Sequence, residues 1–401
     1  MKTILIILDG LGDRPIAKMG GRTPLQAADT PVLDWLAERS ICGQLYALGM
    51  GLRPSSDAAH MKLLGVDYDT YYTGRGAIEL YGLGKTMSDS DIAIRGNFAQ
   101  VALDGTILDR RAKRQLPSQK ILDELALITI DDVEFRLHSN IRHSFALQLT
   151  GPELSSKISD SDPHQEGVHA MKVRPLEESH QAKKTAELLN KYISHVGEFL
   201  MEEYQMARSK CNSILMRSAS SRPIWFDFSE KYGFSSSCCI VNSALENGIG
   251  SLLGMERKNK KRYQNYQEYY HEIPKMMLEA LDKNDFVFLH IQEPDLYGED
   301  GNPQGKLQVI EEIDQTLRFL KKLNPKDHLV IITADHSTPC CLHAHSGDSV
   351  PMLVYGGENR KDDVSRFDEI SCAKGGLGTV YGKDFMNMIQ NFRGDAELIG
   401  G

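Results

Sequence analysis

Residues 329–339 read LVIITADHSTP, in which a continuous apolar run stops at charged residues. A run of this kind, without alternation of polar residues, is typical of a strand buried on both faces of a parallel sheet. Residues 3–8 (TILIIL) and 286–291 (FVFLHI) show the same pattern. One run lies at the N-terminus and two lie in the last third of the chain. A sheet that contains all three must therefore carry a long segment inserted between its parts, and we expect an α/β fold.

Polar side chains that can hold a metal ion follow each of these runs. Asp9 follows the first run, Asp295 follows the second, and Asp335 with His336 follows the third. In open α/β sheets, ligands bind beyond the carboxyl ends of the strands. Asp9 in the motif LDG by itself indicates no more than a turn. The prediction of a site therefore depends on the combination.

The long middle segment has the pattern of a second α/β domain. Strand-like pieces such as 145–150 and 237–241 alternate there with helical stretches, of which 177–206 is the longest. The expected first domain is a mostly parallel sheet flanked by helices, and the inserted domain is smaller. The predicted division is residues 1–70 with 276–401 for the first domain and residues 71–275 for the insert.

One basic segment has no evident place in either domain. Residues 257–262 read RKNKKR, and four tyrosines follow by position 270. A run of like charges is most often a solvated face. We therefore expect an exposed loop here.

The charge balance excludes some classes of partner. The chain has 401 residues, with 46 Lys and Arg against 55 Asp and Glu, for a net charge of −9. General nucleic-acid binding needs a net basic surface, so it is not expected. No apolar run approaches the roughly 20 residues of a membrane span. An anionic ligand would have to be bound by local cations, either arginines or metal ions.

The cysteines favour a reducing compartment. Seven are present, and four of them form adjacent pairs, at 238–239 and 340–341. Neighbouring cysteines rarely form disulfides because the bond geometry is demanding. Buried free thiols in a cytoplasmic protein are therefore expected.

A serine at a predicted helix start is a candidate nucleophile. Residues 54–60 read PSSDAAH, and Ser56 precedes a helix-compatible run. A serine in this position is most often an N-cap. A helix N-terminus also stabilises negative charge and offers N–H donors to a phosphoryl group. Both interpretations are open from the residues alone.

Two further acidic and histidine motifs extend the candidate metal site. Asp295 and Glu299 lie four positions apart, so on a helix they share one face and can share a cation. His345 follows the Asp335–His336 pair by nine residues. Carboxylates and imidazoles are the usual ligands for Mn²⁺, Zn²⁺ and Fe²⁺. Two such ions about 4 Å apart act as a clamp for phosphoryl transfer.

Taken in order, the motifs resemble those of one enzyme family nearly from end to end. The chain resembles the archaeal-type, cofactor-independent (2,3-bisphosphoglycerate-independent) phosphoglycerate mutases of the alkaline phosphatase superfamily. The motifs that carry the resemblance include LDGLGDRP (8–15), SDAAHMKLLG (56–65), YYTGRGAIELYGLG (71–84), DRRAKR (109–114), DSDPH (160–164), TADHSTP (333–339) and HSGDSVP (345–351).

The resemblance implies an alkaline-phosphatase-like domain and an isomerase that interconverts 2-phosphoglycerate and 3-phosphoglycerate through a phosphoserine. It implies two divalent ions, which we expect to be Mn²⁺ with Mg²⁺ or Zn²⁺ as alternatives, and no 2,3-bisphosphoglycerate. The implied ligands are Asp9, Ser56, Asp335 and His336 for one ion, and Asp295, Glu299 and His345 for the other. The implied substrate-binding residues are Arg95, Arg110, Arg111, Asp162, His164 and Arg217.

This sequence departs from the family pattern at the site itself. Glu299 stands where the family has a histidine, which adds a charge and a harder oxygen donor. Ser55 stands where the family usually has glycine, so Ser55 competes with Ser56 as the phosphorylated residue. Arg142 and His143 appear in the reverse of the usual order, and neither is assigned.

These departures leave two further functions open. The same serine and ions could release phosphate to water, as a phosphomonoesterase does. Alternatively, the chain could be a drifted homologue that binds or acts on another small phosphorylated metabolite. The sequence does not determine the oligomeric state.

Overall fold

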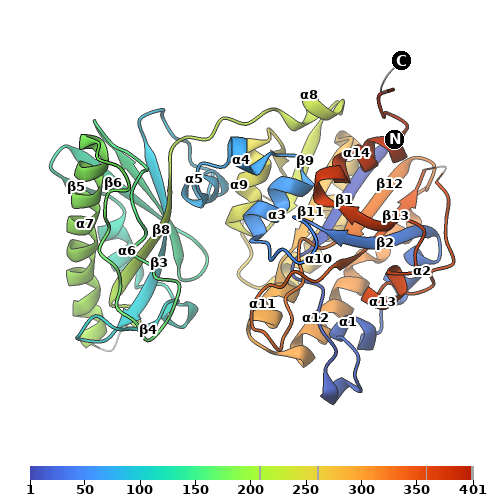
Figure 1. Cartoon of the computed structure of the whole chain (residues 1–401), viewed down its shortest axis with the longest axis horizontal. Helices are drawn as coiled ribbons and strands as arrows, with labels where there is room; N and C mark the ends of the chain where they lie inside the picture. Colours follow the sequence, from blue (N-terminus) through green and yellow to red (C-terminus); the bar gives the residue numbers. More distant parts are fainter. Residues whose placement is uncertain (207–208, 260–261, 358, 399–401) are drawn as a thin grey trace. The chain divides into compact units, whose positions relative to one another are not determined.

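The computed structural model describes residues 1–206, 209–259, 262–357 and 359–398. Contacts within the chain divide it into two compact units (Figure 1). Unit 1 contains Met1–Thr70, Trp225–Glu246 and Leu253–Gly401, and unit 2 contains Tyr71–Ile224 and Asn247–Leu252. The insert begins at the expected residue, but the chain returns to unit 1 about fifty residues earlier than the boundary expected at 276.

Unit 1 is built on an eight-stranded sheet in the order β10-β9-β11-β1-β12-β13-β2-β14. The central strand β1 (Lys2–Leu8) pairs in parallel with β11 (Phe286–Ile291) on one side and with β12 (His328–Thr333) on the other. These are the three strands that the apolar runs predict. Only β13 (Val350–Gly356) runs antiparallel to both of its neighbours. The mixed, mostly parallel sheet confirms the predicted fold class.

Helices flank this sheet (Figure 1) because its central strands are apolar on both faces and almost wholly buried. The remaining strands of unit 1 are β2 (Ser40–Tyr46), β9 (Ser237–Val241), β10 (Glu256–Arg257) and β14 (Gly378–Tyr381). The helices that lie mainly in unit 1 are α1 (Pro24–Ala27), α2 (Pro31–Ala37), α3 (Ser56–Leu63), α4 (Tyr68–Tyr71), α8 (Phe228–Tyr232), α10 (Tyr266–Lys283), α11 (Glu293–Glu299), α12 (Pro303–Thr316), α13 (Glu369–Cys372) and α14 (Gly382–Arg393). Helix α9 (Ala244–Leu252) begins in unit 1 and continues into residues assigned to unit 2.

The strand at 237–241 corrects the predicted boundary of the insert. It is β9, and it pairs in parallel with β11 and β10 in the main sheet. The apolar run SCCIV is buried at every position. Such a run fits either sheet, because hydrophobic periodicity does not say which strand lies beside it.

The tyrosine-rich segment is not the exposed loop that its charges predict. Arg257 belongs to the short strand β10, and positions 260–261 lie outside the described residues. From Tyr266 onward the chain forms α10, with Asn265 as its N-cap. Tyr269 and Tyr270 pack inward on this helix, where they are about 1% and 5% exposed. The apolar bodies of the tyrosines outweigh the charges that precede them.

Unit 2 is an antiparallel sheet in the order β4-β3-β7-β6-β5, with β8 paired to β3. The long helix α7 (His180–Gln205) packs on one face, and α5 (Arg75–Gly82) contacts β3, β7 and β8. The other elements of unit 2 are β3 (Ile92–Val101), β4 (Ile107–Asp109), α6 (Gln119–Leu125), β5 (Ile128–Ile130), β6 (Val133–Ser139), β7 (Ser144–Thr150) and β8 (Ser213–Ser220). Short 3-10 helices occupy Ala17–Met19, Ala112–Arg114 and Leu317–Lys322.

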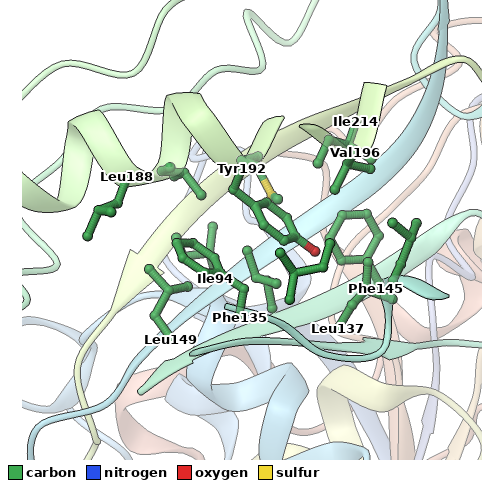
Figure 2. Packing of buried hydrophobic residues seen from close by; sticks show 14 of the residues in the cluster. Ile94, Phe135, Leu137, Phe145, Leu149, Leu188, Tyr192, Val196 and Ile214 are labelled. Carbon is green, nitrogen blue, oxygen red and sulfur yellow. The ribbon is translucent and has the colours of Figure 1, made fainter. Parts of the chain in front are cut away.

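The core of unit 2 lies between α7 and the sheet (Figure 2). Tyr192 projects from α7 and stacks on Phe135, with ring centroids 4.6 Å apart and an angle of 9° between the rings. Aliphatic side chains of β3, β6 and β7 surround the pair. The hydroxyl of Tyr192 is buried and makes no hydrogen bond with the described residues. Burial raises the pKa of this hydroxyl, so it is un-ionised.

We expect Tyr192→Phe to stabilise unit 2. A buried hydroxyl without a partner carries an uncompensated desolvation cost, so its removal should raise the free energy of unfolding by about 1 kcal/mol. Tyr269→Phe is the matched control, because the Tyr269 hydroxyl donates to the carbonyl of Ile240 at 3.0 Å. The free energy of unfolding of Tyr269→Phe should fall by about 1 kcal/mol, because a buried hydrogen bond is removed. Denaturant titration measures both, and a lowered midpoint for Tyr192→Phe would contradict the expectation.

The cysteines agree, with one exception, with the prediction of buried free thiols. All seven cysteines are free thiols, and only Cys341 is exposed. Within the described residues, no helix combines the length and the apolar character that a membrane crossing requires.

Candidate active site

The carboxyl ends of β1 and β12 bring the first group of predicted ligands together. Asp9, Asp335 and His336 each offer a ligand atom, and these atoms lie within 4.8 Å of one another. The Nε2 atom of His336 is 3.1 Å from Asp335 Oδ2 and 3.4 Å from Asp9 Oδ1. All three residues are at most 2% exposed. Adjacent parallel strands deliver these side chains to the same edge of the sheet.

A glycine makes this close approach possible. Gly10 follows Asp9 with φ +62°, and a Cβ atom there would lie 2.7 Å from the Asp295 backbone. Its backbone N–H donates to Asp335 Oδ1 at 3.2 Å. The LDG motif is therefore a turn that also orients a carboxylate.

The end of β11 and the loop after β12 supply the second group. Asp295, His336 and His345 offer ligand atoms within 4.8 Å of one another. The imidazoles of His336 and His345 stack, with centroids 3.6 Å apart. Thr338 donates its hydroxyl to Asp295 Oδ1 at 2.6 Å. His336 thus belongs to both groups, which places them side by side.

Glu299 is not a member of this second group. It is the last residue of α11, four positions after Asp295, and it is partly exposed. Its charge nevertheless reaches the site. Burial is the main cause of the raised pKa of Asp295, and the Glu299 charge adds to it, against the opposing effect of the two histidines.

Burial and mutual charge shift the pKa values of the carboxylates and imidazoles at the sheet edge. Burial, followed by the charge of Asp335, raises the pKa of Asp9 well above its ordinary value. Burial also acts to raise the pKa of Asp335, but the contacts with His336 outweigh it and the pKa is lowered. The same contacts raise the pKa of His336 against burial. A bound cation favours the deprotonated form of each ligand, so we expect metal affinity to rise with pH.

Ser56 lies beside the shared histidine. It is the first residue of α3, and its Oγ is 3.4 Å from His336 Nε2. Ser55 occupies the N-cap position, is exposed, and makes no side-chain capping bond. Of the two serines, Ser56 is therefore the one that contacts a candidate metal ligand.

A buried lysine joins the loops that carry the ligands. Lys306 of α12 is fully buried. Its Nζ donates to the carbonyls of Gly12 and Thr338 and to Asp13 Oδ2, each at 3.0 Å. The loops after β1 and β12 are thus connected without any metal ion.

The predicted substrate-binding residues form a second cluster, within unit 2. Arg110 makes a two-pronged salt bridge to the buried Asp162, from Nε to Oδ1 at 2.9 Å and from Nη2 to Oδ2 at 2.7 Å. Arg217 Nη1 lies 3.6 Å from the same carboxylate. The backbone N–H of His164 donates to Asp162 Oδ1 at 2.9 Å. Asp162 therefore holds two guanidinium groups and a histidine in one place.

Arg95 joins this cluster through β3. It lies opposite Arg217 in the β3–β8 pairing. Its Nε is 3.2 Å from Glu79 Oε1, and Arg75 Nε is 2.7 Å from the same atom. Burial opposes ionisation of Glu79, but the arginines lower its pKa. Sequence reasoning missed Arg75 and Glu79, although both lie in the quoted motif at 71–84.

His143, which the sequence left unassigned, also belongs to this cluster. Burial, followed by the charges of Arg111, Arg95, Arg114 and Arg217, lowers its pKa to about 3. The His143 imidazole is therefore neutral, and it can donate or accept a hydrogen bond in a part of unit 2 that is strongly electropositive. The reversed order of Arg142 and His143 gave no basis for assigning it.

A third ligand group in unit 1 was also missed. His60 of α3, His290 of β11 and Glu246 of α9 offer ligand atoms within 4.8 Å of one another, and all three are buried. Burial lowers the pKa of His290 to about 4, so its imidazole is neutral. The feature of the sequence that could have indicated this group is His290, the single polar residue inside the apolar run FVFLHI.

Comparison with known proteins agrees with this geometry. A family model described as the metalloenzyme superfamily matches residues 1–391. The chain is 37% identical to 2,3-bisphosphoglycerate-independent phosphoglycerate mutase 1 of Methanocaldococcus jannaschii, over 100% of this chain and 99% of the relative. It is 40% identical to the enzyme of the same name from Thermoplasma volcanium, over 99% and 98%. The chain belongs to the archaeal-type 2,3-bisphosphoglycerate-independent phosphoglycerate mutase family.

Solved structures support membership of this mutase family. A cofactor-independent phosphoglycerate mutase from Thermoplasma acidophilum matches with a TM-score of 0.66 and 34% identity, over 98% of this chain and 99% of that one. A protein from Pyrococcus horikoshii matches with a TM-score of 0.81 and 30% identity, over 100% and 99%. Each match covers nearly the full length of both chains, so the fold of both units is shared with these structures.

Proposed function

We propose that the chain interconverts 2-phosphoglycerate and 3-phosphoglycerate by transferring the phosphoryl group to Ser56 and back. The observation that carries the proposal is the position of Ser56 Oγ, 3.4 Å from the histidine that both ligand groups share. Full-length similarity to enzymes named as these mutases supports the substrate.

The residues at the sheet edge fit two divalent cations. Asp9 Oδ1 and Asp335 Oδ2 are buried and make no hydrogen bond with the described residues. Buried polar atoms are almost always paired, so these two oxygens are available to bind a cation. Asp9, Ser56, Asp335 and His336 would hold one ion, and Asp295, His345 and Glu299 the other. When bound, the ions supply charge stabilisation at the phosphoryl oxygens and a lower pKa for the serine hydroxyl.

Ser56 acts as the nucleophile. Its oxygen forms a bond to phosphorus as the bond from phosphorus to the glycerate oxygen breaks; the serine gives up its proton and the departing oxygen gains one. The other glycerate hydroxyl then attacks the phosphoserine in the reverse sense. Ser56 stands at the N-terminus of α3, where the positive end of the helix dipole would stabilise the charge of the transferred group.

The arginine cluster of unit 2 binds the anionic groups of the substrate. Planar guanidinium groups match carboxylate and phosphate oxygens in pairs. Asp162 acts as a positioning residue, because it fixes Arg110 through two hydrogen bonds and is itself fully buried. Arg95, Arg111, His164 and Arg217 complete the proposed set.

An enolase-coupled assay tests the proposal. The chain is given 3-phosphoglycerate with Mn²⁺ and without 2,3-bisphosphoglycerate, and formation of 2-phosphoglycerate is followed. Conversion without release of phosphate supports the mutase. Release of inorganic phosphate alone would instead show a phosphomonoesterase, and neither product would show a homologue with another substrate.

Replacing Glu299 should change the metal preference. A carboxylate near Asp295 favours harder ions, so the wild type should prefer Mn²⁺ or Mg²⁺ over Zn²⁺ at the second position. Glu299→His should shift the ratio of affinities toward Zn²⁺ by about tenfold. Competitive titration of the metal-free chain measures the ratio. The same ratio in both proteins would exclude Glu299 as a ligand.

A further inference from the structure

The third ligand group, formed by His60, Glu246 and His290, lies outside both groups assigned to phosphoryl transfer. His60 is one helical turn after Ser56 on α3, His290 is the fifth of six residues in β11, and Glu246 lies in the first turn of α9. None of the three is more than 2% exposed. One ligand atom from each lies within 4.8 Å of the other two.

The polar atoms of this group are not satisfied by the described residues. Both ring nitrogens of His290 and the Nε2 atom of His60 are buried and make no hydrogen bond. The ion-pair distances of the Glu246 carboxylate within the described chain are to imidazoles, 3.8 Å to His60 Nδ1 and 3.9 Å to His290 Nε2. Buried polar atoms in native proteins are almost always paired, so atoms of this kind point to a missing ligand.

The hydrogen bond made by His60 leaves its Nε2 atom without a partner. Its Nδ1 lies 2.8 Å from the Ser56 carbonyl oxygen. That oxygen can only accept, so Nδ1 carries the proton and Nε2 carries the lone pair. Histidines that bind metals usually have this arrangement, in which the other ring nitrogen donates to a carbonyl or a carboxylate.

We propose that His60, Glu246 and His290 bind a third divalent cation of the Zn²⁺ class. Two imidazole nitrogens and one carboxylate oxygen are a donor set for Zn²⁺ or a similar transition metal, whereas Mg²⁺ and Ca²⁺ prefer oxygens alone. Ligands held at about 2.1 Å from a tetrahedral ion lie about 3.4 Å apart. The 3.9 Å between Glu246 Oε1 and His290 Nε2 is a few tenths longer, which small side-chain rotations would close.

The proposed ion is a neighbour of the proposed phosphoryl-transfer site. His290 Nε2 is 3.2 Å from Asp9 Oδ2, and His60 Nδ1 is 3.6 Å from Asp335 Oδ2. Glu246 adds a buried carboxylate that belongs to neither of the other two ligand groups. A third ion offsets the charge of this carboxylate. It also fixes the His60 imidazole, which donates a hydrogen bond to the Ser56 carbonyl.

Metal counting on the full-length chain tests the proposal. The protein is stripped with a chelator, refilled with Zn²⁺ alone, desalted, and measured by mass spectrometry of the elements. The wild type should hold three Zn²⁺ per chain and Glu246→Gln two. Glu203→Gln should still hold three, because Glu203 is a buried carboxylate with an unpaired oxygen but lies outside every ligand group.

Anomalous scattering at the zinc edge gives a second measurement that does not depend on the folding of a variant. Wild-type crystals should show a peak among His60, Glu246 and His290. A count of two in the wild type with no peak there would overturn the third site and leave the proposed phosphoryl transfer standing. A count of zero would overturn the third site, and the enolase-coupled assay with Mn²⁺ would then decide the phosphoryl transfer on its own. A third ion that persists in Glu246→Gln would place it elsewhere and reject this assignment.

Discussion

Ser56→Ala should lower the mutase rate by roughly four orders of magnitude or more, because removal of a covalent nucleophile leaves only binding and electrostatic effects. The fold should persist, since Ala is a good helix former and the Ser56 side chain is only partly buried. Substrate binding should survive, because the arginine cluster of unit 2 is untouched. The enolase-coupled rate and the substrate affinity from calorimetry are the two measurements.

Ser55→Ala is the matched control. Ser55 is exposed and its hydroxyl makes no capping bond, so this variant should keep a rate within a few-fold of the wild type. Acid quenching during turnover and peptide mass spectrometry should find phosphate on Ser56. Phosphate on Ser55, or a dead Ser55→Ala beside an active Ser56→Ala, would reverse the assignment.

Asp335→Asn should remove one metal ion per chain and lower the rate by roughly a thousandfold, the equivalent of about 4 kcal/mol of lost charge stabilisation. The Oδ1 atom of Asp335 accepts from the backbone N–H groups of Gly10 and His336, and an amide oxygen can keep both bonds. The Oδ2 atom has no hydrogen bond and is the expected ligand. An amide nitrogen in its place cannot bind a cation.

The control for this variant is Asp348→Asn. Asp348 pairs at the surface with Arg14, at 2.7 Å, and lies outside every ligand group. An exposed ion pair contributes at most about 1 kcal/mol to the free energy of unfolding, so the fold should persist in this variant. Its metal content and rate should therefore equal those of the wild type. Elemental analysis and circular dichroism on the same samples separate loss of the ion from loss of the fold. An Asp335→Asn protein with a full complement of metal would contradict the assignment.

The sequence was most informative where a residue's environment follows from the strand in which it lies. Continuous apolar runs predict buried parallel strands, and the ends of parallel strands meet at one edge. Asp9, Asp335 and His336 could therefore be grouped from the sequence alone. Asp295 was grouped for the same reason.

Non-local pairing and buried polar groups could not be predicted in this way. The run at 237–241 is equally apolar in either sheet, so its place beside β11 depends on pairing that periodicity does not record. His290 was read as part of an apolar strand, since a single polar residue does not disturb the pattern. Glu246 was not singled out from the sequence, because one acidic residue in the first turn of a helix is common.

Glu299 shows a different limit. Four-residue spacing on a helix puts Asp295 and Glu299 on one face, but it does not decide how far a flexible glutamate reaches. The structure instead groups Asp295 with His336 and His345, which come from the loop after β12. The role of Glu299 as a ligand stays a prediction, and the titration of Glu299→His decides it.

The position of β1 has a consequence for the order in which the protein is made. Thr3 lies opposite Phe286 and Leu329, so the first strand of the chain gains both neighbours only after more than three hundred residues have been synthesised. Unit 2 is almost entirely one continuous segment, Tyr71–Ile224, and has its own core. On the ribosome the insert can fold first, whereas β1 stays unpaired until β11 and β12 have been synthesised. The ligands after β11 and β12 are synthesised after the insert, so the candidate metal groups can form only once residue 345 has been made.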